Sequence, residues 1–160
     1  MKKYIHILFV TIIAVSVTSC LKRGLEDLPE FEENDITGIN RVEYRFISDD
    51  VSNASGQKIV KFVNLPIKGT PEINNVEKIV RLEVSVPKAN SSFTEAERDK
   101  VALSNLSIIV NLSTAARIFP IGSSPKLGVP GDWSKPNKYL VEAANGNKAE
   151  WTIEVISLHK

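Results

Sequence analysis

Apolar and polar residues alternate along much of the chain after residue 36, which is the pattern of β-strands that bury one face. Val80, Leu82 and Val84, for example, would lie on one face of such a strand. Similar alternation, or a run of β-favouring residues, occurs at 41–46, 58–63, 106–112, 138–144 and 149–156. Several short strands at this spacing predict an all-β fold in which two sheets pack face to face as a β-sandwich.

Turn-forming residues separate these segments. An Asn-Gly-Asn sequence at 145–147 predicts a tight hairpin between the last two strands, because Asn and Gly tolerate a positive φ angle. A stretch rich in Ser, Asn, Asp and Gly at 48–56 predicts the loop of an earlier hairpin. One short helix is expected near residues 94–101, because Thr94 and Glu97 have the spacing of a capping box.

The first twenty residues predict a targeting segment and not a fold element. Two lysines precede an apolar stretch at 4–17 that is too short for a comfortable membrane span. Val-Thr-Ser-Cys at 17–20 then resembles the lipobox of bacterial lipoproteins, in which the cysteine is lipidated and becomes the first residue after cleavage. We therefore expect a signal peptide at 1–19 and a lipid anchor at Cys20, the only cysteine. An ordinary signal peptide with an incidental cysteine is the alternative.

The residues after Cys20 predict how the domain is held at the membrane. The two or three acyl chains of a bacterial lipoprotein anchor it effectively permanently. Leu21 stands where an Asp tends to retain enteric lipoproteins at the inner membrane, so we expect outer-membrane placement. Residues 20–35 predict an extended tether before a domain at 36–157, because 26–35 holds six acids and no base. An acidic signal for export to the cell surface is the alternative interpretation.

Charge and residue inventory argue against several functions. Of the 20 basic residues, loss of the two signal-peptide lysines leaves 18 against 19 acids, without the positive excess that nucleic-acid binding needs. His6 lies in the signal peptide, and His159 is expected to be frayed at the carboxyl end. We therefore expect no enzyme activity and no cofactor. Paired carboxylates remain a possibility in principle, although Glu43 and Glu83 are expected to point outward.

A metal site has one weak candidate in the sequence. Asp49, Asp50 and Asn53 place three oxygen-bearing side chains within five residues and could help to bind calcium. They lack the position pattern and the terminal Glu of a known calcium loop. A turn whose side chains hydrogen-bond to their own backbone is the alternative that we favour, so no bound metal is expected.

Two longer stretches carry a family resemblance. VALSNLSIIVNLSTAARIFP at 101–120 and PKLGVPGDWSKPNKYLVEAANGNKAEWTIEV at 125–155 resemble Bacteroidetes lipoprotein domains with an immunoglobulin-like sandwich. The resemblance is close over about 76–155 and looser over 36–75, where a hairpin extends the basic unit. It implies an immunoglobulin-like, cell-envelope lipoprotein, often encoded near glycan-uptake systems, with no established enzymatic activity and no catalytic residue to transfer.

Two functions of different classes remain. In the first, an exposed aromatic ring stacks on a sugar and nearby polar groups bond its hydroxyls, with Trp133, Asp132 and Asn137 as candidates for binding a polysaccharide. In the second, the domain is a structural or interaction subunit that packs on an envelope protein through sheet edges or loops. Trp133 itself is better explained as a packing residue at the end of the sandwich.

Overall fold

The computed structural model describes residues 30–160, and the predicted signal peptide and Cys20 lie outside this range. The strands are β1 (Ile36–Val51), β2 (Lys58–Leu65), β3 (Glu72–Asn74), β4 (Ile79–Ser85), β5 (Leu106–Leu112), β6 (Arg117–Pro120), β7 (Asn137–Glu142) and β8 (Lys148–His159). A short helix, α2 (Glu95–Asp99), and a 3-10 turn, η1 (Leu103–Asn105), lie between β4 and β5. No helix within residues 30–160 is long and apolar enough to cross a membrane.

The strands form two sheets, in the orders β2-β1-β5 and β3-β4-β8-β7-β6. Neighbouring strands are antiparallel except β4 and β8, which run parallel. The inward-facing residues of both sheets form one apolar core, which includes Val42, Val84, Ile108 and Ile153. The predicted all-β sandwich is therefore confirmed, and alternation along each strand explains which side chains enter the core.

The short helix is also confirmed, with one change in its cap. The Thr94 hydroxyl accepts a hydrogen bond from the Glu97 backbone N–H at 3.3 Å, as the sequence predicts. The Glu97 carboxylate, however, accepts from the Tyr44 hydroxyl at 3.2 Å and pairs with Lys100 at 2.6 Å. The second half of the capping box is thus replaced by a contact that ties α2 to β1.

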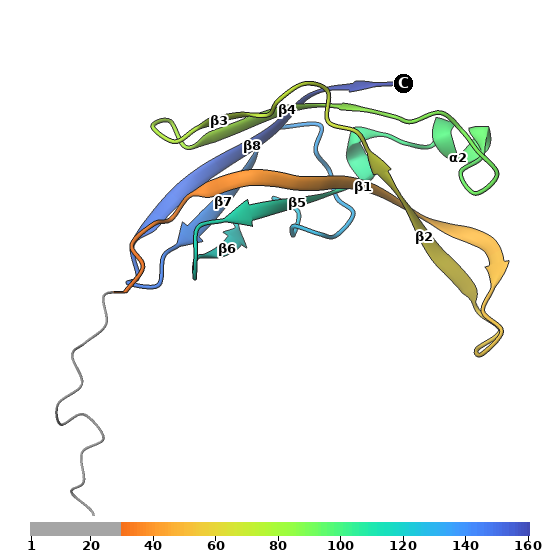
Figure 1. Ribbon diagram of the computed structural model, residues 1–160, viewed down its shortest axis with the longest axis horizontal. Helices are drawn as coiled ribbons and strands as arrows, with labels where there is room; N and C mark the ends of the chain where they lie inside the picture. Colours follow the sequence, from red (N-terminus) through yellow and green to blue (C-terminus); the bar gives the residue numbers. More distant parts are fainter. Residues whose placement is uncertain (1–29) are drawn as a thin grey trace, which may run out of the picture.

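The four sheet edges differ in how they are protected. The segment 128–133 covers the edge of β5, because Gly128 and Gly131 donate backbone N–H bonds to Ile108 and Leu106. The edge strands β3 and β6 have only three and four residues. The eight-residue β2 pairs with β1 alone over Lys58 to Leu65. Figure 1 shows the far ends of β1 and β2 leaving the body of the sandwich on the side where α2 lies.

Glu43 lies on the outer face of its strand, as expected from the sequence, but it is buried there. It is only 1% exposed on this face of β1, which points away from the core. Arg41 and Arg45, on the same face, contact its carboxylate at 2.6 and 2.9 Å, and Ser107 is its cross-strand neighbour on β5. The two arginines neutralise the charge of the Glu43 carboxylate and shield it from solvent, which explains how it is buried on an outer face.

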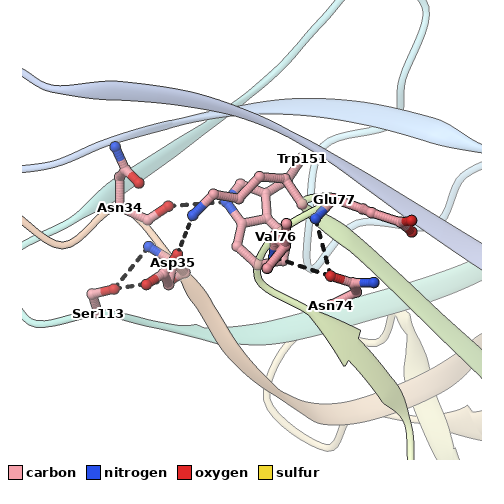
Figure 2. A network of polar contacts seen from close by, with 8 residues as sticks. Asn34, Asp35, Asn74, Val76, Glu77, Ser113 and Trp151 are labelled. Atoms are coloured by element: carbon pink, nitrogen blue, oxygen red, sulfur yellow. Dashed lines mark hydrogen bonds and ion pairs between the residues drawn. The ribbon is translucent and has the colours of Figure 1, made fainter.

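A polar cluster fastens the start of the domain to the sandwich (Figure 2). The Ser113 hydroxyl accepts from the Asp35 backbone N–H at 2.8 Å, and the Trp151 indole donates to the Asn34 carbonyl at 2.9 Å. The Lys78 ammonium pairs with the Asp35 carboxylate at 2.6 Å and lies 5.1 Å from the centre of the Trp151 ring. Ordered contacts with the sandwich therefore begin before residue 36, inside the predicted tether.

We predict that Lys78→Met lowers the free energy of unfolding by about 1 kcal/mol, because it removes a half-buried ion pair and a cation–π contact. Denaturant unfolding of the soluble domain measures the change. Lys138→Met is the matched control, since Lys138 pairs with Glu150 in a more exposed setting. Equal losses in the two variants would show that the Lys78 cluster does not hold the domain start.

Candidate functional site

Trp133 is a packing residue. Its side chain is fully buried, and its ring stacks on Tyr139 of β7 with centroids 6.1 Å apart and an angle of 18° between planes. Its indole N–H donates to the Leu106 carbonyl of β5 at 3.0 Å, and its backbone N–H donates to Leu103 at 2.7 Å. No face of the ring is available to a sugar, so the ligand-platform interpretation of Trp133 is wrong.

The two polar candidates beside Trp133 also serve the loop. Asn137 is 1% exposed, and its amide donates to the carbonyls of Asp132 and Lys135 at 2.9 and 3.1 Å. Asp132 is exposed and accepts from the hydroxyl and backbone N–H of Ser134, which lower the pKa of the Asp132 carboxyl. The three candidates are close together, but the polar groups of Asp132 and Asn137 bond within the loop and hold its shape.

The same loop packs tightly against its own start. A side-chain Cβ at Gly131 would lie 2.2 Å from Cβ of Pro125, so only glycine fits at this close approach. The Tyr139 hydroxyl donates to the Pro125 carbonyl at 2.8 Å, and burial raises the pKa of Tyr139. These contacts hold the loop in which the segment 128–133 covers β5.

Asp49 and Asp50 each contact a lysine. Asp49 accepts from Lys58 at 3.0 Å, an interaction that lowers the pKa of the Asp49 carboxyl, and Asp50 pairs with Lys61. Asn53 lies in the exposed turn that follows β1. Within residues 30–160, no group of three or more His, Cys, Asp or Glu side chains is placed to hold a metal ion. Backbone hydrogen bonds between Ser52 and Gln57 and between Gly56 and Ser52 close the turn, and Asp49 and Asp50 form ion pairs between the flanking strands in place of the expected bonds to their own backbone.

His159 is ordered, which corrects the expectation of a frayed end. It is the last residue of β8 and is paired with Ser85 of the neighbouring parallel strand. Its Nε2 atom lies 2.8 Å from both the Ser157 hydroxyl and the Glu83 carboxylate. Hydrogen bonding of the Glu83 carboxylate to His159, and then to Ser157, lowers the pKa of Glu83. In a catalytic triad the hydroxyl and the carboxylate contact opposite ring nitrogens. Because both contacts here use one nitrogen, the arrangement does not have the geometry of a triad.

A groove lined by both apolar and polar residues lies between the β1–β2 hairpin and the segment 90–100. We call it the hairpin groove; it consists of two adjoining depressions of about 260 and 380 Å³ that share Phe46, Lys61 and Ser92. The smaller depression is also lined by Val60, Phe62, Val63, Asn90 and Phe93. The larger is mainly polar, with Ser48, Asp49, Asp50, Thr94, Glu97 and Lys100 among its lining residues.

An aromatic cluster forms the floor of the hairpin groove. The half-buried Phe46 ring stacks on Tyr44 at 5.8 Å and contacts Phe93 at 6.1 Å with a tilt of 46°. Burial, followed by the charge of Glu97 and its hydrogen bond, raises the pKa of Tyr44 to about 12. The Tyr44 hydroxyl therefore remains a neutral donor, and its bond to Glu97 keeps α2 beside the aromatic floor.

Sequence patterns did not predict this site because its walls are far apart in the chain. Phe46 follows the alternation of a buried strand residue, and the segment 90–100 reads as a loop and a helix. The exposed hydrophobic residues Val60 and Phe62 on a strand that ends a sheet were the one available signal.

Comparisons with known proteins agree with this architecture. Residues 36–154 match the DUF5018-related family over most of the chain. The chain belongs to the DUF5018-related family. A crystal structure of a Bacteroides fragilis protein that is thought to be secreted is 43% identical, with a TM-score of 0.73, and the alignment covers 82% of this chain and all of that one. No curated protein matches this DUF5018-related chain in sequence.

We predict that Trp133→Ala lowers the free energy of unfolding by about 3–5 kcal/mol, because it leaves a cavity between the sheets and removes the indole hydrogen bond to the Leu106 carbonyl. Thermal and denaturant unfolding measure the loss. Phe119→Ala removes an aromatic ring that is 45% exposed on β6 and is the matched control, with an expected loss below about 1 kcal/mol. A loss at Trp133 as small as that at Phe119 would contradict the packing role.

Proposed function

We propose that this protein is a noncatalytic binding module of the bacterial cell envelope that captures a glycan in the hairpin groove. It is lipidated at Cys20, anchored in the outer membrane and built on an immunoglobulin-like sandwich. The similarity to a Bacteroides fragilis protein that is thought to be secreted supports a location outside the cytoplasm. The lipobox-like sequence supports the anchor.

The observation that carries the proposal is that a half-buried aromatic ring, Phe46, lines both depressions and has a polar border. Sugars present apolar C–H faces and many hydroxyls, so they suit a ring such as Phe46 surrounded by hydroxyl and charged groups. Ser92 and Thr94 are exposed on one wall, and Asp50 and Lys61 stand on the other. Within residues 30–160, the hairpin groove brings these hydroxyl and charged groups together around its aromatic floor.

The position of the groove on the sandwich suits a module held at its amino-terminal end. The described chain enters the sandwich at the end where Asn34 and Asp35 are fastened. The β1–β2 hairpin projects from the opposite end (Figure 1). An anchor at Cys20 would therefore leave the hairpin groove directed away from the attachment point.

A second candidate function is capture of a protein partner, and the unprotected edge of β2 favours it. Ile47, Val60 and Phe62 lie on the outer face of the hairpin and are 66%, 64% and 57% exposed. Proteins ordinarily protect a sheet edge by making its strand very short, by covering it or by placing charged residues on it. An extended segment of an envelope protein could pair with β2 and cover these side chains.

Affinity electrophoresis tests glycan capture. We predict that the soluble domain is retarded by at least one of soluble starch, xyloglucan, galactomannan and polygalacturonate, and that Ser92→Trp abolishes the retardation. Ser92 is exposed and borders both depressions, so the larger side chain blocks the groove without disturbing the core. Ser123→Trp, on a distant exposed loop, is the control and should behave as wild type. If none of the four polymers retards the wild type, the glycan proposal fails.

The anchor has its own prediction. Cys20→Ser should abolish incorporation of a radiolabelled fatty acid and move the protein from the membrane to the soluble fraction, because it removes the acylated thiol. Expression in a Bacteroides host followed by membrane fractionation measures both effects. Continued labelling of the Cys20→Ser variant would refute lipidation at this residue.

A further inference from the structure

We infer that the hairpin groove binds internal units of a linear, uncharged glycan, and not the end of a chain or an acidic polymer. The inference rests on the proposed function, because it specifies the glycan that the same groove accepts. Three observations support it: the size of the two depressions, the exposed residues that line them, and the pairing of the charges of the groove.

The volumes argue for a ligand that lies across both depressions. Sites that enclose a small molecule usually measure about 300–1,000 Å³. The depressions measure about 260 and 380 Å³, at or near the lower limit, and they adjoin at Phe46, Lys61 and Ser92. A ligand held by one depression alone would make few contacts, whereas consecutive units of a chain could occupy both.

Exposed residues line both depressions of the groove. Asn90 and Ser92, which line the smaller depression, are exposed. Lys100 lines the larger depression, and its side chain is also largely exposed. Such a lining suits an open groove, whereas a socket for a chain terminus would be walled by buried residues. A polymer could enter at one end and leave at the other.

The charges of the groove are balanced in pairs. Asp50 pairs with Lys61, and Glu97 pairs with Lys100 at 2.6 Å. Asp49 is matched by Lys58 at 3.0 Å on the adjoining strand. A carboxylate on the ligand would have to compete with an existing partner for each lysine, and it would approach a paired acid at the same time. Uncharged hydroxyls can bond to these paired groups without separating them.

The first test uses the four polymers in the electrophoresis experiment. We expect starch, xyloglucan or galactomannan to retard the domain and polygalacturonate to have no effect. Retardation by polygalacturonate alone would overturn this inference and leave glycan capture standing. The absence of retardation by any polymer would remove both.

A charge variant sharpens this test. Asp50→Asn frees Lys61 from its partner, so we expect this variant to gain affinity for polygalacturonate, by at least threefold at low salt. Asp132→Asn makes the same change in charge outside the groove and is the matched control, with no expected gain. Equal gains in the two variants would show that net charge, and not the pairing within the groove, sets the preference.

Oligosaccharides of the retained polymer, two to eight units long, test recognition of internal units. Isothermal titration calorimetry should show affinity that rises at least tenfold between two and five units, and reduction of the terminal sugar with borohydride should leave the longer oligomers unaffected. Binding that is equally strong for the disaccharide, or that is lost when the terminal sugar is reduced, would show recognition of a chain end and would overturn the inference.

Discussion

The contact on which the rest of this sandwich depends is the one that Trp133 makes between its two sheets. The indole N–H bonds to Leu106 on the three-stranded sheet, while the ring stacks on Tyr139 of the five-stranded sheet. A buried tryptophan contributes a large apolar area and requires a partner for its N–H, and here one side chain meets both requirements. The contact joins the sheets and also fixes the loop that covers β5.

That cover determines which part of the molecule is available for binding. With β5 protected and β3 and β6 short, β2 is the one long strand edge without a partner among the described residues. The β1–β2 hairpin extends beyond the core, and the Tyr44–Glu97 bond holds α2 opposite its inner face. The hairpin groove therefore results from a closed sandwich at one end and an unpaired hairpin at the other.

The sequence predicted those features that depend on local patterns. Alternation located the long strands, and the Thr94 cap located α2. Local patterns did not predict β3 and β6, which are too short to show a period. They also did not predict the parallel pairing of β4 with β8, which joins distant segments. The outward face of Glu43 was predicted but its burial was not, because alternation reports the face of a strand and cannot report that two arginines cover a carboxylate there.

The candidate site was harder to predict for the same reason. The stretch around Trp133 combines an aromatic ring with Asp, Asn and Lys, which is the composition of a binding loop, and burial alone distinguishes it from one. The groove joins Phe46 to residues 90–100, and no local pattern can report that contact. The proposed site therefore lies at the hairpin and not in the loop at 131–139, because the fold brings Phe46 and residues 90–100 together and buries Trp133.

Chemical-shift mapping by NMR tests this relocation most directly. The ¹⁵N-labelled domain would be titrated with oligosaccharides of the polymer that retards it. The account predicts that the backbone amide signals of Phe46, Lys61 and Ser92 shift with a common affinity, while the indole N–H signal of Trp133 does not move. Shifts concentrated at the Trp133 indole and residues 131–139, with the hairpin signals unchanged, would contradict it.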